Sequence, residues 1–95
     1  MTQAFWDSSS IVPLCVQQPS SATARLLSGQ YGMTVWWATA VEVRSSFARL
    51  VRNGQISFNG QVQAFVVFDD LRQSWREITG LVLIRSQPIS LPEVT

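Results

Sequence analysis

The stretch Ala4–Leu14, AFWDSSSIVPL, sets how the chain begins to fold. A short apolar run ends at Asp7 and the three serines 8–10, and a second apolar run follows directly. Aspartate and serine in this position are typical helix caps. The same aspartate would also stand at the end of a strand, where an α/β protein places its binding sites. Asp7 is therefore either a cap or one corner of a metal site, and for the residue in isolation we favour the cap.

Apolar periodicity predicts alternating strands and helices along the chain. A continuous apolar run predicts a strand over 33–37, and short strands are also predicted over 3–6 and 75–79. Helices are predicted after Ser9 or Ser10, with Pro13 in the first turn, and then over 22–28, 40–52 and 60–74. The order strand, two helices, strand, two helices, strand predicts an α/β fold with a short parallel sheet flanked by helices. The strands at 3–7 and 33–37 should be neighbours.

The helix boundaries and faces can be specified further. Gly29 is expected to stop the second helix, and Asn53-Gly54 the third. Two apolar stripes should face the core. They comprise Ala40, Val43, Phe47, Leu50 and Val51 in the third helix and Val62, Phe65, Phe68 and Leu71 in the fourth.

Composition narrows the possible classes of protein. Ninety-five residues make at most one small domain. No apolar run is long enough to cross a bilayer, and the N-terminus lacks the pattern of a signal peptide. Cys15 is the only cysteine, so it has no disulfide partner in the chain, and a buried inert thiol is expected there. We expect a cytoplasmic protein that does not associate with membranes.

Histidine and lysine are both absent from the chain. The chain has no histidine, which excludes histidine-based acid–base catalysis and Ser-His or Cys-His nucleophiles. All seven cationic residues are arginines, which suit phosphate contacts, yet the net charge is only +1. Any catalysis is therefore expected to depend on carboxylates and a hard cation. The carboxylates are Asp7, Glu42, Asp69, Asp70, Glu77 and Glu93.

Glu42 follows the second strand as Asp7 follows the first. Thr39-Ala40-Val41-Glu42 matches a T-x-x-E capping box, in which Glu42 would reach back to the Thr39 N–H. Glu42 also shares one edge of its helix with Ser46 and Arg49, where a carboxylate can line a cleft. Two acids at adjacent strand ends would tolerate each other best around Mg²⁺ or Mn²⁺. Their carboxylates should then lie within roughly 10 Å.

The other acids have simpler interpretations. Asp69 and Asp70 point about 100° apart on a helix, and Asp69 is expected to pair with Arg72 on a solvated face. Glu77 lies in a short strand and is assigned no chemistry.

Three segments together resemble PIN domains of the VapC toxin type: FWDSSSIVPLCVQQP, VWWATAVEVRSSFARLVRNGQIS and LRQSWREI. They cover most of the chain to Ile78. The resembling features are Asp-x-Ser at the end of the first strand, Val-Glu at the start of the helix after the second, and Gly-x-(Ile/Leu)-Ser after that helix.

The resemblance implies a three-layer α/β fold and an Mg²⁺- or Mn²⁺-dependent endoribonuclease. Asp7 and Glu42 would be its catalytic metal-binding acids, with Ser9 supporting Asp7. Arginines such as Arg44, Arg49 and Arg52 could contact RNA phosphates, although for each one we favour the interpretation as a solvated charge on the helix surface. The resemblance further implies a homodimer that a cognate antitoxin silences.

The chain departs from the family toward its C-terminus. The family carries further acids in a stretch resembling L-R-A-x-D-A-L, and the segment LVLIRSQPISLPEVT contains no such motif. Pro88 and Pro92 would break the helix expected there. We therefore expect residues 1–95 to form a single PIN-like domain truncated at its C-terminus, with slow catalysis. The alternative is an inactive remnant that serves only as an antitoxin-binding or dimerising module.

Overall fold

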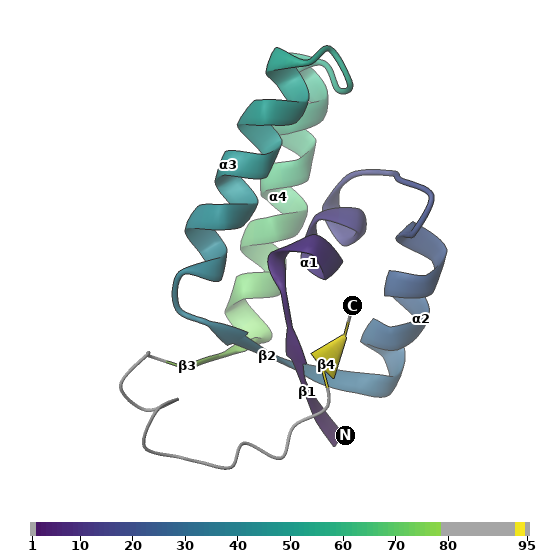
Figure 1. Ribbon diagram of the computed structural model, residues 1–95, viewed down its shortest axis with the longest axis vertical. Helices are drawn as coiled ribbons and strands as arrows, with labels where there is room; N and C mark the ends of the chain where they lie inside the picture. The colour runs from purple at the N-terminus through teal and green to yellow at the C-terminus, as the bar shows by residue number, and fades with distance from the viewer. Residues whose placement is uncertain (1, 79–92, 95) are drawn as a thin grey trace.

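The computed structural model describes residues 2–78 and 93–94, which form an α/β fold with a parallel sheet flanked by helices (Figure 1). The predicted end of the third strand at Thr79 and the segment carrying Pro88 and Pro92 lie outside the described residues. The elements are β1 (Thr2–Trp6), α1 (Ser8–Cys15), α2 (Ser21–Gln30), β2 (Tyr31–Trp36), α3 (Thr39–Arg52), α4 (Phe58–Ser74), β3 (Arg76–Ile78) and β4 (Glu93–Val94).

The described strands pair in the order β3-β2-β1-β4, and every pair is parallel. The predicted pairing of the first two strands is confirmed, with Trp6 opposite Val35 at their carboxyl ends. Trp36 of β2 in turn lies opposite Ile78 of β3. The short strand β4 was not predicted. The α/β class and the alternation of strands with helices are as expected.

Helix α1 begins earlier than the sequence suggested. Its N-cap is Asp7, not Ser9 or Ser10, and the Asp7 side chain accepts a hydrogen bond from the Ser9 N–H. The helix therefore starts at Ser8, and Pro13 lies beyond the first turn instead of within it. The cap interpretation of Asp7 is confirmed.

Two glycines with the same predicted role behave differently. Gly54 has φ of 72° and ends α3 as predicted, because glycine adopts the left-handed region at little cost. Gly29 stays out of that region, and α2 continues through it to Gln30, so the predicted stop was wrong. At the other end of α2, the buried Ser21 hydroxyl donates to the Pro13 carbonyl at 2.7 Å, which ties α2 to α1.

Aromatic rings from α3, from α4 and from Trp75, the residue that follows α4, pack against one another in the core. Phe47 is fully buried and meets Phe65 and Phe68 edge to face, at centroid distances of 5.2 and 5.9 Å. Phe68 meets Trp75 in the same manner at 5.6 Å. Such contacts add to the burial of the rings themselves.

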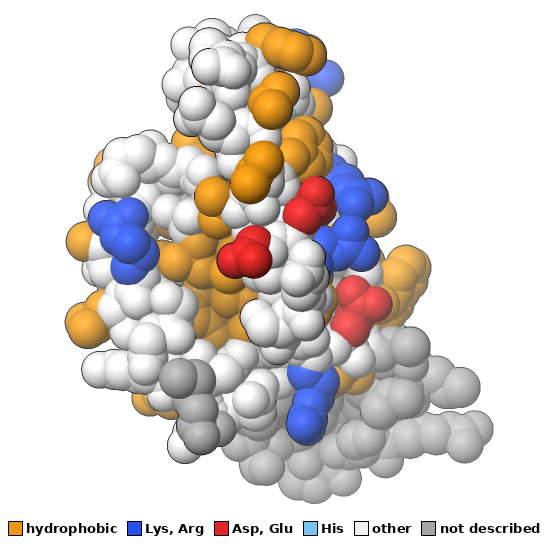
Figure 2. Space-filling view, turned by 180° about the vertical axis from the view of Figure 1, so that it is seen from behind, with side chains coloured by type: hydrophobic (Ala, Val, Ile, Leu, Met, Phe, Trp, Pro, Cys, Tyr) orange, Lys and Arg blue, Asp and Glu red, His pale blue; other side chains and the backbone are white. Residues whose placement is uncertain are grey.

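The predicted inner face of α4 was partly wrong. Phe68 is buried, but Val62 is 47% exposed, and Ala64 packs in the core instead. The helix is rotated so that Phe58, Val62 and Val66 form an outward apolar row. Figure 2 shows apolar side chains running along the helical lobe that rises above the sheet. No helix among residues 2–78 combines the length and hydropathy needed to cross a membrane.

Cys15 lies in the last turn of α1 and is half-buried, where a buried thiol was expected. Burial raises the pKa of the Cys15 thiol from 9.0 to about 12. Because the thiolate is the nucleophilic form, this thiol is unreactive near neutral pH.

Replacement of Phe47 by alanine should lower the free energy of unfolding by about 3–5 kcal/mol, since it removes a buried ring with two edge-to-face contacts. Val62→Ala, on the exposed row of the partner helix, should change it by about 0.5 kcal/mol or less. Urea denaturation of both variants measures the difference. Equal losses would contradict the assignment of inner and outer faces.

Candidate functional site

The parallel pairing of β1 and β2 brings two polar segments to one edge of the sheet. Asp7 follows β1 directly, and α3 begins at Thr39, shortly after β2 ends at Trp36. Since Trp6 lies opposite Val35, the carboxyl ends of both strands meet at this edge. Binding sites of open parallel sheets form in this position. Asp7 and the first turn of α3 thus share the edge where the sequence predicted a site.

The Asp7 side chain is half-buried and is hydrogen-bonded to Ser9. The Asp7 Oδ2 atom accepts one hydrogen bond from the Ser9 N–H at 3.2 Å and a second from the Ser9 hydroxyl at 2.7 Å. The first bond caps α1, and the second fixes the rotation of the carboxylate. Ser9 thus has the geometry of a residue that supports Asp7.

Glu42 lies in the first turn of α3, and its side chain is exposed. The predicted capping box does not form. The N-cap is Ala38, one residue earlier than expected, and it makes no side-chain cap bond. Thr39 is instead the first helical residue and is buried. Within residues 2–78, the Glu42 carboxylate takes part in no described hydrogen bond or ion pair, so capping does not account for this acid.

A groove of about 250 Å³ runs between α1 and α3. Ser9 lines one wall, and Ser46 and Arg49 line the other. The Arg49 Nη2 atom donates to the Ser46 hydroxyl at 3.1 Å, and that hydroxyl donates to the Glu42 carbonyl at 3.0 Å. The serine that holds Asp7 and the arginine on the Glu42 edge of α3 therefore face one groove. Neither Asp7 nor Glu42 lines the groove.

The acids at this edge offer the type of donor atom that a hard divalent cation takes. Carboxylate oxygens are the ligands that Mg²⁺ and Mn²⁺ prefer. Asp7 and Glu42 would hold such an ion, and water would supply most of the remaining ligands. Among residues 2–78, no cluster of three or more ligating side chains is found. Asp7 and Glu42 are therefore ligands of the right chemical type for such an ion, but they are only two, so we expect weak binding.

Three other charged side chains, all on α4, do not line the groove. Arg72 lies over the Phe68 ring at 5.7 Å. The predicted Asp69–Arg72 ion pair is not found among residues 2–78. Asp69 and Asp70 are exposed on α4, away from the α1–α3 groove.

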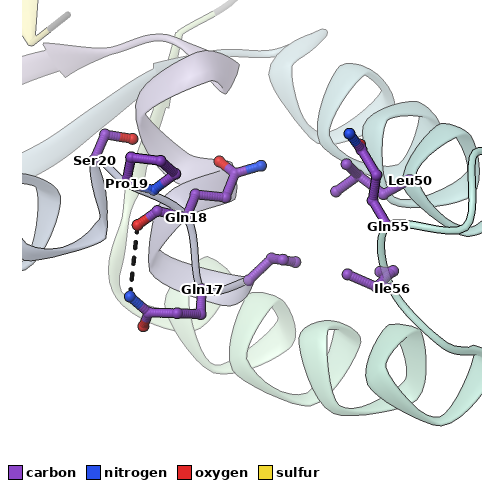
Figure 3. Close-up of a pocket in the computed structure, with 8 residues that line it drawn as sticks. Gln17, Gln18, Pro19, Ser20, Leu50, Gln55 and Ile56 are labelled. Atoms are coloured by element: carbon purple, nitrogen blue, oxygen red, sulfur yellow. Dashed lines mark hydrogen bonds between the residues drawn. The ribbon is translucent and has the colours of Figure 1, made fainter.

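A larger pocket of about 560 Å³ was not anticipated from the sequence. Figure 3 shows one wall formed by residues 16–20, in the loop between α1 and α2. The facing wall carries Leu50, Gln55 and Ile56, from the end of α3 and the following loop. Gln18 and Leu50 line both this pocket and the smaller groove, so the two are adjacent. No local sequence signal predicts this pocket, because its two walls face each other only through the packing of α1 against α3.

Comparison with known proteins identifies no family for this chain. No protein-family model matches it. No curated protein is significantly similar to it in sequence. The resemblance to PIN domains accordingly rests on the residues quoted above.

The cap and the charge of Asp7 can be separated by substitution. Asp7→Ala should lower the free energy of unfolding by about 1 kcal/mol, because the α1 cap is lost. Asp7→Asn should change it by only a few tenths, because asparagine caps as well as aspartate. Thermal or urea unfolding of both variants measures the two losses and separates the effect of the cap from that of the charge. A large loss in Asp7→Asn would mean that the charge itself holds the fold.

Convergence of Asp7 and Glu42 on one cation is a second expectation. Substoichiometric Mn²⁺ should broaden the amide NMR signals of residues 8–10 and 40–43 together, because a paramagnetic ion relaxes all nearby nuclei. Asp7→Asn should weaken both effects in parallel, and Asp69→Asn, a matched change on α4, should weaken neither. Broadening confined to one segment would contradict a shared site.

Proposed function

We propose that this chain is a cytoplasmic, metal-dependent endoribonuclease of the PIN type that hydrolyses phosphodiester bonds of single-stranded RNA. The observation that carries the proposal is the placement of two acids, Asp7 and Glu42, at the carboxyl edge of adjacent parallel strands, beside a groove that Ser9 and Arg49 line. The quoted resemblance to VapC-type toxins supports the same reaction.

Each residue at the edge has a proposed task. Asp7 and Glu42 supply negative oxygen ligands for Mg²⁺ or Mn²⁺. Ser9 holds the Asp7 carboxylate in one rotation through the 2.7 Å hydrogen bond. Arg49 offers a fork of N–H donors that matches a phosphate bordering the scissile bond. Its bond to Ser46 limits the conformations open to the guanidinium.

The bound cation would polarise the phosphate and lower the pKa of a water molecule. No side-chain nucleophile is invoked, which agrees with the absence of histidine from the chain. With few protein ligands, we expect weak cation affinity and slow turnover.

The exposed apolar row of α4 favours a second candidate function. Phe58 is 73% exposed and Val66 67% exposed, and they follow one face of the helix with Val62 between them. A contiguous apolar row on a surface favours association with another protein. In this alternative the chain is an inactive interaction module. The partner we propose is a second copy of the chain, and the cognate antitoxin remains an expectation from the resemblance.

Ribonuclease activity is tested with the purified chain and a mixture of single-stranded RNAs. Cleavage should require Mg²⁺ or Mn²⁺ and stop in EDTA. Asp7→Asn and Glu42→Gln should each lower the rate at least tenfold, because each removes a negative ligand while nearly conserving volume. Asp69→Asn should leave it unchanged.

Two results would contradict the proposal. Cleavage that persists in EDTA would exclude the metal mechanism. Absence of cleavage at millimolar Mn²⁺ by a folded chain would leave the interaction module as the remaining function. Light scattering then tests that module, since Val66→Asp should shift a dimer toward monomer.

A further inference from the structure

We infer that the pocket between the ends of α1 and α3 binds an adenine base of a single-stranded RNA whose backbone lies in the α1–α3 groove. The inference rests on the proposed function for the identity of the strand. It concerns a different part of the surface, with its own residues and its own chemistry.

The lining of the pocket suits an uncharged ligand with polar edges. Gln18 and Gln55 reach it from opposite walls, and Gln17 lies beside Gln18 (Figure 3). Val16 and Ile56 add apolar surface on the two sides. No charged side chain is among the lining residues, so a phosphate would find no counter-charge there. The volume of about 560 Å³ lies within the range of about 300–1,000 Å³ typical of small-ligand pockets.

Glutamine carboxamides match the edges of adenine. Each carboxamide presents a donor and an acceptor side by side, and glutamine pairs in this way with the N6 and N7 atoms of adenine. Adenine carries a second such edge at N1 and N6, so glutamines on facing walls can contact both edges of one base. Uracil has a single face of this kind and a smaller ring. Unstacked bases of single-stranded RNA are free to be read at these edges.

The position of the pocket links it to the proposed cleavage site. Leu50, which follows Arg49 in α3, lines both the pocket and the groove, as does Gln18. A backbone phosphate at Arg49 therefore borders the pocket, and the base of an adjoining nucleotide can enter it. The Gln18 side chain is available for this contact, since its backbone N–H is the group that bonds Ser21.

The test is equilibrium binding in EDTA, which separates recognition from cleavage. Fluorescence anisotropy measures the affinity of three labelled strands of equal length: oligoadenylate, oligouridylate and an abasic strand with the same backbone. The unaltered chain should bind oligoadenylate about tenfold or more tightly than the abasic strand, as expected for one bidentate pair. Gln55→Leu, at a residue that lines the pocket and not the groove, should remove most of that preference and leave affinity for the abasic strand unchanged. Gln18→Leu should also remove most of the preference.

Gln63→Leu, the same change on the exposed face of α4, is the matched control and should retain the preference. Circular dichroism confirms that each variant is folded. Equal affinity for all three strands, or no binding of any strand, would overturn the inference. A preference for oligoadenylate in a chain that does not cleave RNA would uphold base recognition and reject the nuclease alone.

Discussion

The parallel pairing of β1 with β2 is the constraint on which the site depends. With Trp6 opposite Val35, both strands end at one edge of the sheet, and the segments that follow them must leave from neighbouring points. Helix α1 begins at once, while α3 begins after a short turn. The two helices pack against each other and leave the groove between α1 and the second half of α3, with the pocket next to it where α3 ends. A change of register by one residue would turn Trp6 away from the core and move Asp7 with it.

Asp7 shows how one side chain can serve the fold and a site together. Capping needs only an oxygen lone pair directed at the Ser9 N–H, and Ser9 supplies a second donor through its hydroxyl. Both bonds reach Oδ2, so they fix the plane of the carboxylate. Fixing the carboxylate reduces the entropy that it would lose on binding a ligand. The cap therefore assists a binding role instead of competing with it.

The sequence predicted the elements whose signals are local. The strand β2 came from a continuous apolar run, and the end of α3 at Gly54 came from a residue that adopts positive φ easily. Predictions failed where tertiary packing decides. Gly29 carried the same stop signal as Gly54, but α2 continues through it. Val62 fitted the apolar period of α4, yet the burial of Ala64 sets the rotation of that helix.

The position of the candidate site could be predicted from the sequence, but its detailed geometry could not. That Asp7 and Glu42 follow adjacent strands could be inferred, because parallel strands place their carboxyl ends together. The cap geometry at Glu42 could not, because Thr39 became a buried helical residue and Ala38 took the cap position. The sequence also could not predict that Gln18 and Gln55 face each other, because their positions depend on how α1 packs against α3.

Physical necessity helps to separate the functional positions from the structural ones. At Asp7 the fold requires a capping oxygen, which asparagine or serine would provide as well. At Glu42 it requires no hydrogen bond within residues 2–78, and a negative charge in the first turn contributes only about 0.3–1 kcal/mol through the helix dipole. Each acid therefore carries a charge that the described packing does not demand, and both occur at the edge where two parallel strands end. The nuclease proposal rests on these two charges, which the fold does not require, and on Arg49, which lines the groove between α1 and α3.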